Sequence, residues 1–346
     1  MSVPNSLFID TSIFDGQNYN FESAAFRPFI TAIAGKNLTL ILPDPTYREV
    51  RKHIAERADA VVKALENARR RAPFLAKSQK WPAPGFALSW ELRQLAMEDW
   101  KEFLKHFNVQ NLSFEGVNLS EIMNWYDNQN APFGPKKRKE FPDALALGSL
   151  LAFARRQHLT VAVISADPDF KSACDRFGEV LCFQSLPAFT EALIGSDRRV
   201  EKVRVIFQED SSLLESAVRE EFPALHFYPA GDPDGSVEGV RVSELEFLGI
   251  HVVGVGESEC MIAFDASVRY SAHVEFDDPD SAIVDSSEGI YHKHRTFSGT
   301  VAEEATVSGT AKITVCKDWS AFETISYFDF NELEIEVTEL PPEKFY

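Results

Sequence analysis

The sequence predicts an α/β protein of two domains: a three-layer α/β/α domain with a mainly parallel sheet and inserted helices in residues 1–196, then a β-rich domain in residues 197–346. Three observations predict this. Before residue 196, short apolar runs alternate with segments of helical periodicity. After residue 197, apolar and polar residues mostly alternate with period two. The length of 346 residues also exceeds what one hydrophobic core usually supports.

The first elements lie in residues 6–68. Residues 6–9 predict a strand that ends on Asp10, which Thr11 and Ser12 follow. Residues 37–42 predict a second strand. A long helix is predicted to begin near Thr46, with Glu49 in its first turn, where the helix dipole favours an anion. Because ligands of open parallel sheets bind at the carboxyl ends of the strands, both acids are candidates for a site.

An inserted helical section is predicted for residues 73–135, with helices at 89–107 and 120–125. A further helix is predicted to open at Pro142, which suits the first turn because proline has no backbone donor, and Asp143 falls in that turn. The uninterrupted β-branched run 160–164 is typical of a central parallel strand. That strand brings Ser165, Asp167 and Asp169 to the same sheet edge.

The remaining elements of the first domain are predicted as helix 171–176, strand 179–183 and helix 186–194. Past residue 197, a strand at 203–207 and a helix at 211–222 are expected first. Period-two alternation then predicts a sandwich or a curved sheet, with strands at 237–247, 268–276, 311–316 and 333–337.

The charge is distributed unevenly along the chain. Residues 1–196 contain 23 Lys and Arg against 22 Asp and Glu, whereas residues 197–346 contain 12 against 31, so the net charge of −18 is almost entirely C-terminal. The near-neutral first domain, with its local basic runs, can therefore still approach a phosphate backbone. A secretory signal, a long apolar span and paired CxxC cysteines are all absent from the sequence. We expect a cytoplasmic protein without membrane segments.

Acidic residues follow strands or begin helices at several positions that one parallel sheet would bring to a common edge. These residues are Asp10, Glu49, Asp143, Asp167 and Asp169. Carboxylate oxygens are the ligands that Mg²⁺ and Mn²⁺ prefer, and clustered carboxylates repel one another without a cation between them. Such ions can generate hydroxide and stabilise a phosphoryl leaving group. The pattern predicts metal-dependent phosphodiester hydrolysis.

The segments FIDTSIF, EFPDALAL and VISADPDF, with an acid in the helix after the second strand, resemble the four-motif pattern of PIN-domain nucleases in their longer bacterial form. The resemblance covers about residues 5–195. It implies a PIN-like fold and metal-dependent cleavage of single-stranded or structured RNA, sometimes DNA. It matches motif acids to Asp10, Glu49, Asp143 and the pair Asp167 and Asp169, and supporting hydroxyls to Thr11 or Ser12 and to Ser165.

Two assignments remain open within that resemblance. Asp44 lies near enough to Glu49 to be the second acid, and either Asp167 or Asp169 could contact the metal, with Asp167 favoured because it lies closer to the strand. The basic run just ahead of the third acid predicts phosphate contacts and comprises Lys136, Lys137, Arg138 and Lys139.

Two alternatives to an endoribonuclease are a non-catalytic PIN-like scaffold that binds proteins and a DNA-directed nuclease. The acidic C-terminal domain should repel nucleic acid. We therefore expect it either to contact a protein partner or to cover the basic N-terminal patches in a self-inhibiting way.

Overall fold

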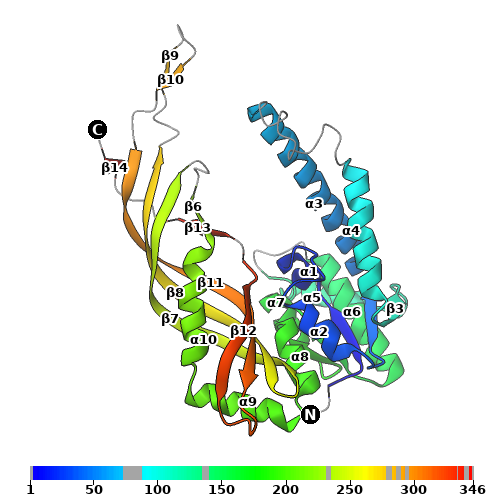
Figure 1. Ribbon diagram of the computed structural model, residues 1–346. Coiled ribbons are helices and arrows are strands. Elements are labelled where there is room, and N and C mark those ends of the chain that lie inside the picture. The colour runs from blue at the N-terminus through cyan, green and yellow to red at the C-terminus, as the bar shows by residue number, and fades with distance from the viewer. Residues whose placement is uncertain are drawn as a thin grey trace. The chain divides into compact units, whose positions relative to one another are not determined.

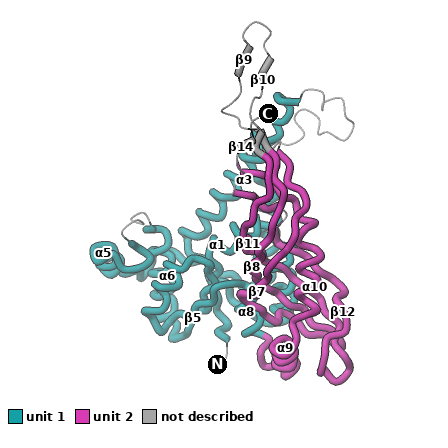
Figure 2. Tube along the Cα trace, turned by 90° about the vertical axis from the view of Figure 1, so that its left-hand side faces the viewer, with its two compact units in different colours: residues 1–193 teal, residues 194–346 magenta. Residues whose placement is uncertain are grey.

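The computed structural model describes residues 3–72, 88–134, 140–230, 235–277, 283–285, 290–292, 296–332, 334–338 and 343–344. The chain divides into two compact units, residues 1–193 and 194–346 (Figure 2). Each unit has its own sheet and its own buried apolar residues, so each is described by itself. Among the described helices, none combines the length and the apolar composition that a membrane-spanning segment requires.

The first unit is built on a five-stranded parallel sheet with strand order β3-β2-β1-β4-β5 (Figure 1). Its strands are β1 (Ser6–Ile9), β2 (Thr39–Pro43), β3 (Asn108–Leu112), β4 (Val161–Ile164) and β5 (Val180–Phe183). Strands β1 and β4 are adjacent at the centre and fully buried, which explains their uninterrupted apolar sequences. The predicted parallel α/β sheet is therefore confirmed.

Strand β3 lies in the section where the sequence predicted only helices. It pairs with β2 at the edge of the sheet, and most of its residues are at least partly exposed. Its sequence, NVQNL, is consequently polar and lacks the apolar run of a central strand.

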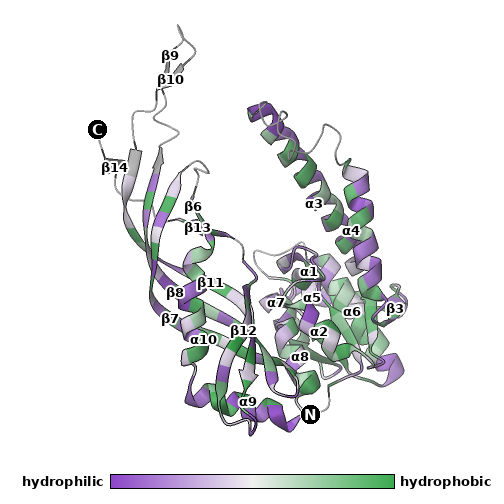
Figure 3. Cartoon of the chain, in the orientation of Figure 1, coloured by the Kyte–Doolittle hydropathy of each residue, from purple (hydrophilic) through white to green (hydrophobic). Residues whose placement is uncertain are grey.

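Helices cover both faces of this sheet and form the other two layers. One face packs against α1 (Thr11–Gly16), α2 (Phe26–Ile33), α3 (Asp44–Arg71), α4 (Ser89–Leu104) and α8 (Leu186–Ile194). The opposite face packs against α5 (Leu119–Asp127), α6 (Phe141–Gln157) and α7 (Pro168–Cys174). Helix α6 is largely apolar (Figure 3), because most of its residues are buried. The carboxyl ends of the strands therefore open between the two helical layers.

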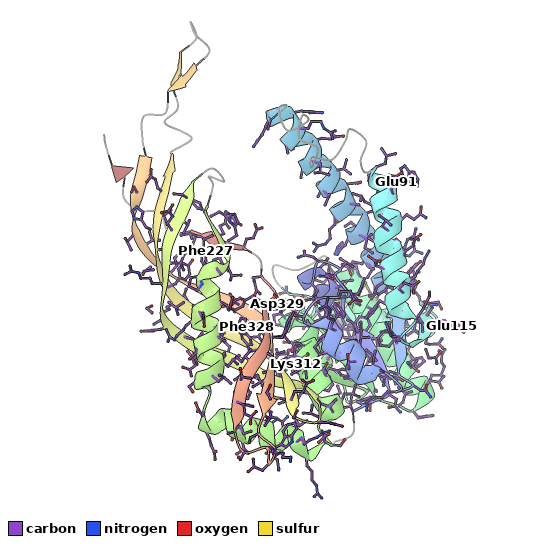
Figure 4. The ribbon with its side chains drawn as sticks, in the orientation of Figure 1. Glu91, Glu115, Phe227, Lys312, Phe328 and Asp329 are labelled. Carbon is purple, nitrogen blue, oxygen red and sulfur yellow. The ribbon has the colours of Figure 1, made fainter. Side chains whose placement is uncertain are left out.

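The second unit is built on an antiparallel sheet of order β12-β11-β8-β7, with β14 also paired to β11. Its strands are β7 (Ser236–Val255), β8 (Glu259–Asp277), β11 (Thr296–Val315), β12 (Phe322–Phe330) and β14 (Glu343–Lys344). Figure 4 labels Lys312 on β11 and Phe328 on the adjacent β12. Register shifts along β7–β8 and β11–β12 bend these long strands, so the region is a curved sheet.

Two helices, α9 (Arg198–Glu209) and α10 (Ser212–Glu221), cover one face of that curved sheet. The strand predicted at 203–207 is therefore wrong, because these residues belong to α9. Val200, Val203 and Ile206 are buried at helical spacing, and this stripe reaches back beyond the short apolar run. The smaller elements are η2 (Phe222–Ala224), the parallel pair β6 (His226–Pro229) and β13 (Glu334–Val337), and the antiparallel pair β9 (Ile283–Asp285) and β10 (Ile290–His292).

Candidate active site

Asp10 lies at the carboxyl end of the central strand β1 and forms the N-cap of α1. Its backbone N–H donates to the carbonyl of Ile164 at the end of β4, over 2.9 Å. The hydroxyls of Ser12 and Ser165 both donate to its Oδ2 atom, over 2.5 and 2.9 Å. The Asp10 side chain is buried, with only 7% of the residue exposed. These hydrogen bonds hold it between the ends of β1 and β4 and orient its carboxylate.

The sequence predicted Glu49 in the first turn of a helix that begins near Thr46. Helix α3 begins two residues earlier, at Asp44, so Glu49 lies in its second turn. The Thr11 hydroxyl donates to Oε2 of Glu49 over 3.0 Å and so joins α3 to α1 next to Asp10. Asp44 instead forms an ion pair with Arg48 over 2.6 Å. The contacts therefore favour Glu49 over Asp44 as the second acid of the site.

Asp143 lies in the first turn of α6, as the sequence predicted, three residues after the N-cap Glu140. Burial, the largest cause, raises the pKa of Asp143 to about 8 together with the Asp10 charge and a hydrogen bond with Glu140. Glu140 is thus a fourth nearby carboxylate that the sequence analysis missed. The sequence feature that could have identified Glu140 is its spacing of three residues from Asp143 at the start of the predicted helix.

Asp167 and Asp169 begin α7, where Asp167 is the N-cap. One oxygen of Asp167 accepts from the Asp169 backbone N–H over 2.7 Å. The Asp167 N–H donates to the Ser165 hydroxyl over 3.2 Å, and the Ala166 N–H donates to that of Ser12 over 3.2 Å. The turn after β4 is therefore linked to Asp10 through two serine side chains.

Three carboxyl groups of this site have raised pKa values. Burial raises the pKa of Asp10 and outweighs the hydrogen bonds that it accepts from its serines. Burial also raises the pKa of Glu49, with the charge of Asp10 adding to it and the Thr11 hydrogen bond and His53 opposing it. Together with Asp143, these groups lie close enough to repel one another.

This chemistry fits a divalent cation. Burial raises the pKa of all three carboxyl groups, and neighbouring carboxylates raise the pKa of Glu49 and Asp143 as well. An oxygen-preferring ion such as Mg²⁺ or Mn²⁺ would neutralise their charges. Within the part of the chain that the structure describes, no three His, Cys, Asp or Glu side chains are already grouped at the spacing of a bound ion.

The predicted hydroxyl residues Thr11, Ser12 and Ser165 all contact acids of the site. The predicted basic run Lys136, Lys137, Arg138 and Lys139 lies outside the described residues, and its role stays a prediction.

Helix α3 carries two further polar residues that the sequence analysis did not single out. Nδ1 of His53 lies 2.7 Å from Oδ2 of Asp15, and the Arg57 guanidinium also contacts Asp15. Both residues follow Glu49 at intervals of four, which is the spacing of one helix face and the signal that was available.

Comparison with known proteins gives one match. A family model described as the PIN domain matches residues 7–170, which include every acid discussed above. No curated protein and no solved structure matches the chain.

Proposed function

We propose that this protein is a metal-dependent endoribonuclease, because a family model described as the PIN domain matches residues 7–170 and PIN domains are generally nucleases. In this proposal Asp10, Glu49, Asp143 and Asp167 hold Mg²⁺ or Mn²⁺ at the carboxyl edge of the parallel sheet, with Asp169 as a further ligand. The observation that carries it is the group of carboxyl groups at the end of β1 and on α3 and α6. Burial raises the pKa of all three, and neighbouring carboxylates raise the pKa of Glu49 and Asp143 as well.

The residues of the site divide the work of phosphodiester hydrolysis. When bound, a divalent ion held by these carboxylates would supply a hydroxide nucleophile and stabilise charge on the phosphate. The hydroxyls of Ser12 and Ser165 orient the Asp10 carboxylate, and that of Thr11 orients Glu49. Hydroxyl donors of this kind fix ligand geometry around a metal. The proposed basic run from Lys136 to Lys139 would bind substrate phosphates.

The test is cleavage of labelled single-stranded and structured RNA by the purified full chain, with DNA of the same sequence in parallel. We expect RNA cleavage that needs Mn²⁺ or Mg²⁺, stops with EDTA and falls at least about 100-fold in Asp10→Asn and Asp143→Asn. Asp99→Asn, an exposed change on α4, is the control and should cleave normally. Cleavage that survives EDTA or both site variants would refute the proposal, and faster DNA cleavage would assign the DNA-directed alternative.

A protein-binding scaffold is the competing function. The observation in its favour is that, among the described residues, no three potential ligands are yet grouped at ion-binding spacing. A scaffold should gain no thermal stability from Mn²⁺, whereas a metal site gains stability from its ligand. A melting curve with and without Mn²⁺ distinguishes the two.

The acidic C-terminal part carries a separate proposal. Residues 197–346 have 12 Lys and Arg against 31 Asp and Glu, so we propose that they bind a basic protein surface or oppose RNA binding by the first unit. If they oppose it, a chain truncated after residue 196 should bind RNA more tightly than the full chain at low salt. Equal binding by the two chains would exclude self-inhibition.

A further inference from the structure

Three residues on one face of α3 each contact α1 or the turn that follows it. Glu49 accepts from Thr11, the first residue of α1, over 3.0 Å. One turn further along α3, His53 Nδ1 lies 2.7 Å from Oδ2 of Asp15, near the end of α1. The third is Arg57, another turn on. These contacts form a ladder that runs from the candidate metal site to the far end of α1.

Arg57 makes most of the contacts at the far end of the ladder. Its Nη1 donates to Oδ1 of Asn18 over 2.5 Å, and its Nη2 donates to the Asp15 carbonyl and to Asp15 Oδ1 over 3.0 and 3.3 Å. The guanidinium also lies over the Tyr19 ring, 5.6 Å from its centre. One side chain therefore holds both the last turn of α1 and the residues Asn18 and Tyr19 in the turn that follows it.

The backbone at those two residues is unfavourable by itself. Asn18 and Tyr19 have φ angles of +52° and +58°, so two successive non-glycine residues occupy the left-handed region. For tyrosine this conformation is a genuine outlier, and each such residue costs on the order of 1 kcal/mol or more. The turn is therefore maintained by tertiary contacts, and Arg57 supplies several of them.

From these contacts we infer that Arg57 and His53 are positioning residues that hold α1 against α3 and thereby set the separation of the Asp10 and Glu49 carboxylates. The inference rests on the proposed metal-dependent function. Helix α1 has only six residues, so fixing its last turn also fixes its first, where Asp10 and Thr11 lie.

Stability alone does not account for this arrangement. The side chains of Asp15, His53 and Arg57 are 31%, 25% and 41% exposed, and ion pairs at such positions contribute about 0–1 kcal/mol. Removing the Arg57–Asp15 ion pair by itself should therefore change the folding free energy little, whereas Arg57→Ala also removes contacts that hold Asn18 and Tyr19. Their measurable effect should be on the geometry of the carboxylates that bind the ion.

The experiment is a calorimetric titration of Mn²⁺ into the full chain, for wild type, Arg57→Ala, Arg57→Lys and His53→Gln. Loss of residues that orient metal ligands typically weakens metal binding about 10- to 100-fold, and we expect such a loss in Arg57→Ala. We expect a smaller loss in Arg57→Lys, because lysine keeps the charge but not the planar, forked donors. His53→Gln should also weaken Mn²⁺ binding, since glutamine keeps only part of the contact with Asp15.

The matched control is Arg93→Ala. Arg93 pairs with Asp59 over 2.6 Å and joins α4 to α3, so its loss removes a similar interhelical ion pair that does not involve α1. It should leave Mn²⁺ affinity unchanged. Urea unfolding of each variant shows whether it is folded, and His53→Gln and Arg57→Lys provide the test if Arg57→Ala does not fold.

The outcomes separate this inference from the proposed function. If wild type binds Mn²⁺ and all three site variants bind equally well, the positioning role is refuted and the proposed function stands. If Arg93→Ala weakens binding as much as Arg57→Ala, the effect is general destabilisation and the positioning role is again refuted. If wild type binds no Mn²⁺, both proposals fail together.

Discussion

At the scale of single residues, Ser165 connects two parts of the candidate site. It is fully buried, donates to Asp10 Oδ2 and accepts from the Asp167 backbone N–H. The Ser165 hydroxyl therefore couples the end of β1 to the start of α7.

We predict that Ser165→Ala lowers the rate of RNA cleavage about 10- to 100-fold, because Asp10 loses a donor that orients it. The variant also loses the hydrogen bond that the Ser165 hydroxyl accepts from the Asp167 backbone N–H. Ser149→Ala is the matched control, since Ser149 is a buried serine whose hydroxyl donates to the Leu145 carbonyl in its own helix. Equal cleavage rates in the two variants would refute the orienting role.

Asp143 predicts how the stability of the metal-free protein depends on pH. Its pKa rises to about 8 on folding, mainly through burial, so the folded protein retains a proton that the unfolded chain releases. This contribution is fully present below about pH 4 and is lost as the pH rises toward about 8. The site is therefore expected to reduce the stability of the metal-free fold at alkaline pH.

Asp143→Asn should remove that dependence. We expect the EDTA-treated variant to melt about 3 °C or more above wild type at pH 8.5, with little difference near pH 4.5. The same variant should no longer be stabilised by Mn²⁺. Asp127→Asn, at the exposed end of α5, is the control. A constant difference between Asp143→Asn and wild type across this pH range would contradict the prediction.

At the scale of elements, α1 is held by an aromatic cluster as well as by the polar ladder. Phe14 is 1% exposed, and its ring contacts five others: Tyr19, Phe21, Phe26, Trp100 and Phe103. These rings come from α1, α2, α4 and the segment between α1 and α2. The cluster therefore packs the short helix that begins at Asp10 onto two longer helices.

Phe14→Ala should destabilise the first unit by about 3–5 kcal/mol, because it removes a fully buried ring and leaves a cavity. Phe14→Leu should cost less, since it retains much of the apolar volume. Urea unfolding monitored by circular dichroism measures both. Equal losses in the two variants would show that specific ring contacts, and not buried volume, determine the stability.

At the scale of the whole molecule, the two units have separate cores. Each of the three clusters of buried apolar residues found in the described regions lies entirely within residues 1–193 or within residues 194–346. A unit with its own core can unfold as its own cooperative transition. The candidate site belongs wholly to the first unit.

We therefore predict two transitions in a calorimetric scan of the full chain, of which Mn²⁺ raises only one. At about 100 times its dissociation constant, a ligand adds about 2.7 kcal/mol, or roughly 5–10 °C for a unit of this size. A scan of residues 194–346 alone identifies the transition that Mn²⁺ should leave unchanged. A single transition that shifts as a whole would contradict this prediction.

The sequence by itself determined the parallel sheet and the presence of a β-rich C-terminal region. It also predicted which acids form the site, and that assignment stays a prediction. It could do so because central strands are buried on both faces and because ligand-bearing residues follow strand ends. It did not reveal the edge strand β3, whose polar sequence carries no burial pattern, or α9, whose apolar run imitates a strand.

Only the tertiary structure decided which residues meet. Glu49 was distinguished from Asp44 by its bond with Thr11, and Glu140 was added by its contact with Asp143. The pairing of His53 and Arg57 with the end of α1 likewise joins residues about 40 positions apart. Such contacts depend on how helices pack in three dimensions. The periodicity of one helix indicates which residues lie on the same face, but it does not indicate which residues that face contacts.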